Sequence, residues 1–169
     1  ICPNKCRPAF PKRSRNKEGK TMKIMSVDYG DVRTGLAVCD RTEFLASPVG
    51  TIVERDFETL VKKVAYAATK ELEVGMVVVG LPRNMDGSYG ERAEKCRRFA
   101  KALNALIPIP VETWDERQTT MQAQRYLDET GVYGKRRKEV IDEVAATIIL
   151  DSYLKYRAGQ QKREAGDQE

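Results

Sequence analysis

Residues 23–40 read KIMSVDYGDVRTGLAVCD, and this stretch decides how the rest of the chain is interpreted. Two β-rich runs, 24–27 and 36–38, flank a turn rich in Gly, Asp and Thr, which predicts a β-hairpin. Asp28 stands where the first apolar run ends. Because burying an unpaired carboxylate costs several kcal/mol, Asp28 is either a turn residue before Gly30 or a ligand for a cation or a hydrogen-bond donor.

Length and composition indicate one globular domain. The chain has 169 residues, of which 41% are hydrophobic and 33% charged. No apolar run approaches the ~18 residues that span a membrane, and the start has no apolar signal region, so we expect no membrane association. We expect Cys39 and Cys96 to be buried as small apolar residues in a reducing, cytoplasmic compartment.

The positive charge belongs mostly to the start of the chain. The net charge is +5, yet residues 1–21 alone hold seven Lys or Arg and one acid. With three prolines and no periodicity, this segment is interpreted as a disordered basic extension or a non-native remnant. The domain is expected over residues 22–157, followed by a frayed polar tail over 158–169.

Apolar periodicity predicts a mixed sheet with helices on both faces, an α/β fold of three layers. The expected order is three strands in a meander, then strands alternating with helices, giving five strands of which the first three are antiparallel. Asp56 is expected to cap the first helix. The expected strands are 23–29, 33–40, 44–52, 76–80 and 109–113, and the expected helices are 56–72, a helix through 106, 114–129 and 139–156.

Four acids are candidates for one site. Asp28 ends the first strand, Asp115 and Glu116 follow the last strand, and Asp142 opens the final helix. Functional groups in open α/β sheets gather at the carboxyl ends of parallel strands. The small residues 145 and 146 would let the final helix approach the sheet and bring Asp142 near Asp28. Singly, Asp115 can instead cap a helix and Asp142 can complement a helix dipole.

Converging carboxylates repel one another unless a cation lies among them. Oxygen ligands select hard cations such as Mg²⁺ or Mn²⁺. The chain contains no His, which excludes a His-based zinc site and a His general base. The sequence therefore favours metal-assisted hydrolysis of a phosphodiester.

A polar loop offers further contacts for phosphate. Residues 80–87 read GLPRNMDG and place Arg83 and Asn84 at the same edge of the sheet, before a helix expected to begin near Ser88. Arg117, Thr119 and Thr120 are further candidates for contact with a substrate backbone. The alternative is a structured turn that uses Pro82 and Gly87 for its geometry.

Four stretches in this order resemble the YqgF family of bacterial RNase H-like proteins. They are residues 28–38 (DYGDVRTGLAV), 79–87 (VGLPRNMDG), 115–120 (DERQTT) and 142–150 (DEVAATIIL). The resemblance covers residues 22–157. It implies an RNase H-like fold and a cytoplasmic nuclease that acts on the 5′ end of pre-16S rRNA or, alternatively, resolves Holliday junctions.

The resemblance also implies roles for particular residues. It makes Asp28, Glu116 and Asp142 the metal-binding catalytic acids, with Asp115 as a further catalytic candidate. Arg33, in the first of the four stretches, is a further candidate for contact with substrate. Leu81 and Pro82 stand where many RNase H-like relatives carry an acid, so Asp115 or Glu116 must substitute.

Two other classes of function compete with the nuclease. The Asp-x-Gly hairpin also resembles the phosphate loop of actin-like ATPases, but those enzymes hold ATP between two such domains and this chain has length for one. A non-catalytic ribosome-assembly factor is compatible with a domain of near-neutral charge. The expected partner is structured nucleic acid, either pre-16S rRNA or branched DNA, bound by a monomer or a homodimer.

Overall fold

The computed structural model describes the backbone of residues 22–84, 86–115 and 136–166. Side chains are described for the first two ranges and for residues 144–160. The elements follow the order β-β-β-α-β-α-β-α, with a π-helical turn after the first helix. Their bounds are β1 Ile24–Asp28, β2 Arg33–Cys39, β3 Ala46–Val53, α1 Phe57–Tyr66, η1 Ala67–Glu71, β4 Met76–Leu81, α2 Glu91–Leu106, β5 Val111–Asp115 and α4 Arg136–Gly166.

The five strands form one sheet in the order β3-β2-β1-β4-β5. Strands β1, β2 and β3 are antiparallel neighbours, whereas β4 lies parallel to β1 and β5 lies parallel to β4. This confirms the predicted mixed sheet. Because β1, β4 and β5 are parallel, their carboxyl ends, including Asp28, meet at the same edge of the sheet.

The hairpin between β1 and β2 requires a glycine at position 30. A Cβ atom there would lie 2.2 Å from the carbonyl oxygen of Arg33, which is too close for any side chain. Asp28 is paired with Gly35 across the hairpin, so it ends a strand and does not belong to the turn. The predicted hairpin is therefore confirmed, with Asp28 at its carboxyl edge.

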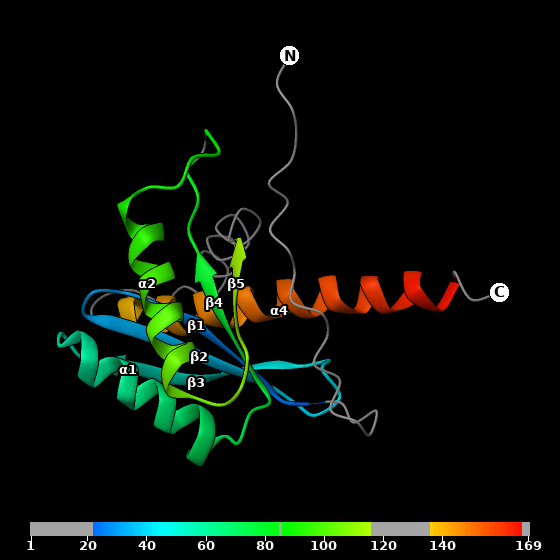
Figure 1. Ribbon diagram of the computed structural model, residues 1–169, viewed down its shortest axis with the longest axis horizontal. Coiled ribbons are helices and arrows are strands. Elements are labelled where there is room, and N and C mark those ends of the chain that lie inside the picture. Colours follow the sequence, from blue (N-terminus) through cyan, green and yellow to red (C-terminus); the bar gives the residue numbers. More distant parts are fainter. Residues whose placement is uncertain (1–21, 85, 116–135, 167–169) are drawn as a thin grey trace.

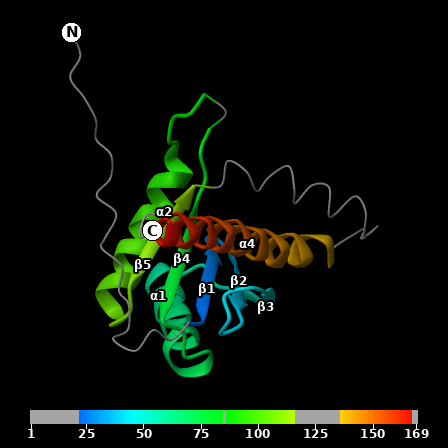
Figure 2. The ribbon, with the colours of Figure 1, turned by 90° about the vertical axis from the view of Figure 1, so that its right-hand side faces the viewer.

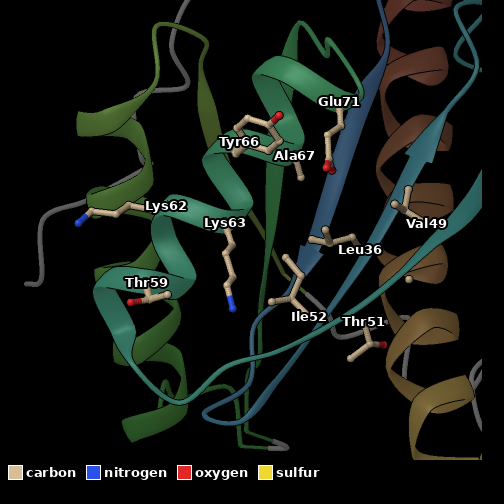
Figure 3. Close-up of a pocket in the computed structure, with 11 residues that line it drawn as sticks. Leu36, Val49, Thr51, Ile52, Thr59, Lys62, Lys63, Tyr66, Ala67 and Glu71 are labelled. Atoms are coloured by element: carbon tan, nitrogen blue, oxygen red, sulfur yellow. The ribbon is translucent and has the colours of Figure 1, made fainter.

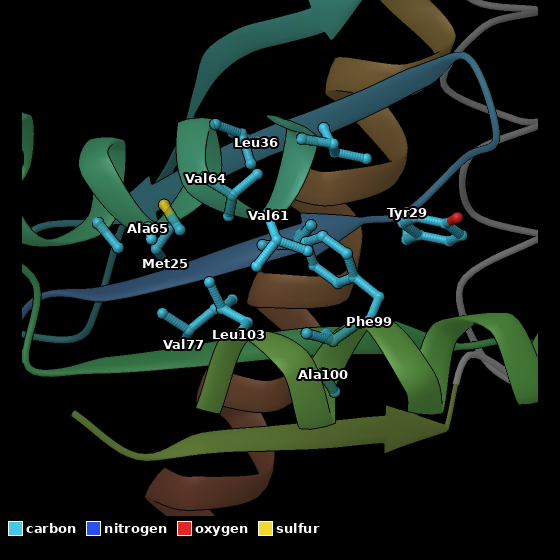
Figure 4. Packing of buried hydrophobic residues seen from close by; sticks show 14 of the residues in the cluster. Met25, Tyr29, Leu36, Val61, Val64, Ala65, Val77, Phe99, Ala100 and Leu103 are labelled. Atoms are coloured by element: carbon cyan, nitrogen blue, oxygen red, sulfur yellow. The ribbon is translucent and has the colours of Figure 1, made fainter. Parts of the chain in front are cut away.

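Three layers result, with the sheet between α1 and α2 on one face and α4 on the other (Figures 1 and 2). Alternation along the strands divides the side chains between two apolar clusters. The larger cluster contains Met25 and Val27 of β1 with residues of α1 and α2 (Figure 4). The smaller contains Ile24 of β1 with Ala146 and Leu150 of α4.

Helix α1 begins as its sequence predicts. The Asp56 carboxylate accepts a hydrogen bond from the backbone N–H of Thr59 at 2.8 Å, and hydrogen bonds from Thr59 hold the Asp56 pKa below its usual value. Apolar side chains at Leu60, Val61 and Val64 then face the sheet.

The last helix differs from its predicted bounds of 139–156. Helix α4 begins at Arg136, within residues 131–138 for which the sequence predicts a basic loop, and it continues through residues expected to be a frayed tail. Residues 158–166 read AGQQKREAG and lack a clear apolar face, but most of them are strong helix formers. Within the described residues, no helix combines the length and apolar character needed to cross a bilayer.

Strand β5 also differs from its prediction. It spans Val111–Asp115 where residues 109–113 were expected, so Asp115 is the last residue of a strand. The predicted helix over 114–129 lies, after Asp115, outside the described residues. Both predicted buried cysteines are confirmed, because Cys39 and Cys96 are buried free thiols.

Candidate active site at the carboxyl edge of the sheet

Asp28 lies on the face of β1 that α4 covers. Its side chain follows Ile24 and Ser26 in the strand alternation, and both of these are buried on that face. The Ser26 hydroxyl donates a 2.6 Å hydrogen bond to the carbonyl oxygen of Ala146. This bond fixes α4 directly against β1, two residues before Asp28.

The final helix approaches the sheet at Ala146, one of the two small residues predicted to allow it. Ala146 is fully buried against the sheet. Position 142 lies one turn before Ala146, toward the N-terminal end of α4. The Asp142 side chain itself lies outside the described side chains.

Asp115 occupies the opposite face. Trp114 packs in the α4 cluster, so alternation directs the next residue, Asp115, toward the side of α2. One Asp115 carboxylate oxygen lies 3.2 Å from Nη1 of Arg83. Strand alternation thus directs Asp28 and Asp115, two acids that the sequence offered for one site, toward opposite faces of the sheet.

The loop between β4 and α2 is a structured turn. The Asn84 side-chain amide donates to the Ser88 hydroxyl at 2.9 Å, and the Asn84 N–H donates to the Ser88 carbonyl. Asp86 accepts hydrogen bonds from the Ser88 hydroxyl and N–H, which hold the Asp86 pKa below its usual value. The structured turn predicted as the alternative for this loop is therefore present, and Gly87 supplies its geometry with a positive φ of 89°. Helix α2 begins at Glu91, after Gly90, and not near Ser88.

Arg83 is held by three groups at this edge. Its Nε donates to the carbonyl oxygen of Gly87, its Nη1 pairs with Asp115, and its guanidinium lies 5.1 Å from the ring centre of Tyr89. Arg97 of α2 also lies over this ring, at 4.3 Å. Sequence reasoning did not identify Tyr89, although an aromatic residue beside a basic helix is a signal for nucleic-acid contact.

A second contact joins α2 to the hairpin, and sequence reasoning missed it too. Nη2 of Arg92 lies 3.9 Å from a carboxylate oxygen of Asp28. Three residues later, Lys95 forms a 3.0 Å ion pair with Asp31, whose hydrogen bond and charge raise the Lys95 pKa. Arg33 begins β2 nearby, and its Nη1 is buried with no hydrogen-bond partner among the described residues.

Some predicted residues are not placed. Within the described side chains, no three acids or thiols are grouped closely enough to hold a metal ion. The predicted residues outside the described part of the chain are Glu116, Arg117, Thr119 and Thr120.

A separate hollow of about 620 Å³ lies between α1 and strands β2 and β3 (Figure 3). Leu36 and Ile52 of the sheet face Lys63, Tyr66 and Glu71 of the helical side, as the close-up shows. The acids of the carboxyl edge do not line it. The hollow is therefore distinct from the group of candidate residues at the carboxyl edge.

The sheet order and layers define the class of protein: an α/β fold shared with Holliday junction resolvases. The structure resembles Thermus thermophilus RuvC bound to a Holliday junction, with a TM-score of 0.53 and 16% identity, over 82% of this chain and 96% of that one. It resembles the yeast mitochondrial resolvase Ydc2 with the same TM-score and 10% identity, over 82% and 80% of the two chains. At these identities the likeness shows the fold.

The chain belongs to the RuvX family, whose model, described as Holliday junction resolvase, matches residues 22–156. A protein of Pelotomaculum thermopropionicum named "Putative pre-16S rRNA nuclease" is 42% identical over 146 residues, 86% of this chain and 94% of that protein. A protein of Listeria monocytogenes with the same name is 45% identical over 137 residues, 79% and 97% of the two chains. The family resemblance read from the four sequence stretches is thereby confirmed.

Proposed function

We propose that this chain is a metal-dependent phosphodiesterase that processes the 5′ end of pre-16S rRNA in the cytoplasm. The observation that carries the proposal is the hydrogen bond from Ser26 to Ala146, which holds the helix bearing Asp142 against the strand bearing Asp28. The names of relatives at 42% and 45% identity support the same substrate.

The donor chemistry at this edge fits Mg²⁺ or Mn²⁺. Asp28 supplies a carboxylate whose side chain is 14% exposed, and the chain has no His to favour a softer metal. Asp28, Glu116 and Asp142 would hold the metal. When bound, the ion supplies an activated water and neutralises charge on the scissile phosphate.

The remaining edge residues orient the substrate. We assign Asp115 to positioning, since it lies on the face opposite Asp28 and its carboxylate holds Arg83. Arg83 is fixed from three sides and presents a planar donor suited to a backbone phosphate. Arg33, Arg117, Thr119 and Thr120 are proposed as further contacts along the nucleic acid, and Asn84 shapes the loop that carries Arg83.

The test is cleavage of a pre-16S 5′ leader and of a synthetic four-way junction, side by side, with Mn²⁺. Asp28→Asn and Asp142→Asn should each lower leader cleavage by more than about 100-fold, since even residues that only orient metal ligands cost 10–100-fold. Asp115→Asn, the matched control, should lower it by only about 10-fold with an unchanged dependence on Mn²⁺ concentration. Leader cleavage at the wild-type rate by Asp28→Asn and Asp142→Asn would show that the carboxylate mechanism is wrong.

Junction resolution is the second candidate. The observation favouring it is the fold shared with RuvC, a protein solved on a Holliday junction. A four-way junction has two symmetric cutting points, so resolution requires a homodimer. Symmetric cutting of the junction by a dimer, without cleavage of the leader, would favour this candidate over rRNA processing.

A further inference from the structure

Arg92 places a positive charge beside Asp28 from another element of the fold. The side chain leaves the first turn of α2, and its Nη2 lies 3.9 Å from Oδ1 of Asp28. That separation is too long for a hydrogen bond, so the contact is electrostatic. The two partners are unequal, because the Arg92 side chain is 66% exposed and that of Asp28 is 14% exposed.

A second charged contact joins the start of α2 to the hairpin. Lys95 shares a helix face with Arg92 by its spacing of three residues, and its ammonium pairs with Asp31 of the hairpin at 3.0 Å. Glu91 lies 3.5 Å from the same ammonium. Helix α2 is anchored more firmly by Ala93 and Cys96, which are buried in the larger apolar cluster, while the Arg92 side chain is largely exposed to solvent.

This arrangement makes Arg92 a competitor for any cation that binds Asp28. A divalent ion and a guanidinium repel each other and seek the same carboxylate. Exposed ion pairs are weak and long side chains rearrange readily, so a metal can displace Arg92 without moving α2. A displaced guanidinium beside a metal site then faces the path of a phosphate backbone, for which arginine is well suited.

We propose that Arg92 occupies the cation position beside Asp28 until a divalent metal enters, and that the released guanidinium then binds a backbone phosphate of the nucleic acid. The inference rests on the proposed function, since it assumes that Asp28 binds a metal. It makes Arg92 the link through which metal strengthens the binding of nucleic acid. By linkage, nucleic acid must strengthen the binding of metal by the same factor.

The test compares Arg92→Gln with Arg97→Gln. Both substitutions remove one arginine from α2, but Arg97 contacts Glu94 and the Tyr89 ring and not Asp28. Mn²⁺ affinity is measured by titration calorimetry without nucleic acid. Arg92→Gln should bind Mn²⁺ about 5-fold more tightly than wild type, a typical size for coupling between sites. Arg97→Gln and the charge-conserving Arg92→Lys should bind it as wild type does.

The second measurement is the affinity for a fluorescein-labelled leader RNA, read by anisotropy in EDTA and in Ca²⁺. Wild type and Arg97→Gln should bind the RNA about 5-fold more tightly in Ca²⁺ than in EDTA. Arg92→Gln should show little of this gain. A substitution that only perturbs the structure is not expected to strengthen Mn²⁺ binding and at the same time weaken the metal-dependent binding of RNA. Thermal unfolding checks that each variant is folded, which the exposure of Arg92 favours.

Two results would overturn the inference and are distinguishable. If Asp28→Asn loses Mn²⁺ binding while Arg92→Gln and Arg97→Gln both match wild type, Arg92 does not compete with metal although the metal site stands. If Asp28→Asn binds Mn²⁺ as tightly as wild type, the metal site at Asp28 is wrong. That outcome removes the proposed function and the role of Arg92 with it.

Discussion

Apolar and polar contacts are divided unequally between the two faces of the sheet. On the side of α1 and α2, the contacts in the core are apolar, and Phe99 packs against Tyr29 and Phe57 with ring centres 4.9 and 6.4 Å apart. On the side of α4, directed polar bonds accompany a smaller apolar cluster. The bonds on this face join Ser26 to Ala146, Trp114 to Ser152, Tyr153 to Glu112 and Arg157 to Glu43.

The polar bonds on the α4 side matter more for where α4 lies on the sheet than for the stability of the domain. Apolar packing is non-directional, whereas a hydrogen bond of 2.6 to 3.2 Å depends on the distance and angle between two particular groups. Helix α4 carries Asp142, and the strand beneath it carries Asp28. The polar bonds therefore set how the two candidate metal-binding elements meet.

Phe99→Ala should give the largest loss of stability. Phe99 is fully buried in the apolar layer, and its truncation should cost about 3–5 kcal/mol, measured by urea unfolding. Phe44→Ala is the control, because Phe44 is 86% exposed and its loss should change stability by less than about 0.5 kcal/mol. Equal losses for the two variants would mean that the apolar face is not the stabilising one.

Tyr153→Phe should give an intermediate loss on the polar face. The hydroxyl donates to Glu112 at 2.7 Å, and a bond to a charged group contributes about 1.5–3 kcal/mol. Thermal and urea unfolding at neutral pH measure this loss. The hydrogen bond between Arg157 and Glu43 remains, so α4 should stay packed on the sheet. The fluorescence of Trp114, whose ring centre lies 5.3 Å from that of Tyr153, measures whether it does.

The same tyrosine gives stability a dependence on alkaline pH. Burial raises the Tyr153 pKa, as do the hydrogen bond and charge of Glu112. The unfolded chain ionises this tyrosine near pH ~10, below the native pKa. The contribution of the Tyr153 hydroxyl to the free energy of unfolding is thus complete below about pH 10 and is lost as the pH rises further. The stability difference between wild type and Tyr153→Phe should narrow there, and a constant difference would contradict this assignment.

Ser26→Ala should give the smallest loss of stability, about 1 kcal/mol, since one neutral hydrogen bond disappears. Its effect on cleavage of the leader should nevertheless exceed that of Tyr153→Phe, because Ser26 lies two residues from Asp28. Ser47→Ala on the exposed strand β3 is the control for both measurements. The comparison of the two faces fails if Tyr153→Phe impairs cleavage more than Ser26→Ala does.

Local signals account for the parts of the fold that the sequence predicted. Asp56 caps α1 as expected because its carboxylate acts on an N–H three residues away. The end of β1 at Asp28 followed from apolar patterning alone. The end of α4 was predicted too early, because helix-forming residues without an apolar face extend it to Gly166.

The contacts of the site were less accessible to sequence reasoning. The pairing of Arg83 with Asp115 and of Arg92 with Asp28 joins residues that are far apart in the chain, so no local pattern encodes either. The assignment of Asp115 to the opposite face depends on β5 ending at Asp115 with Trp114 facing α4. A shift of two residues in the predicted strand concealed that Asp115 belongs to the strand itself.

Strand β3 has a consequence for behaviour at high concentration. It ends the sheet, and exposed apolar side chains flank or lie on it, among them Phe44, Leu45 and Val53. The unpaired backbone groups of such an edge can pair with a strand of a second chain and start aggregation. Pro48 supplies no N–H for that pairing, and the register irregularity opposite Leu36 and Ala37 interrupts the ladder at the same place. Both features are devices that limit edge-to-edge pairing of sheets.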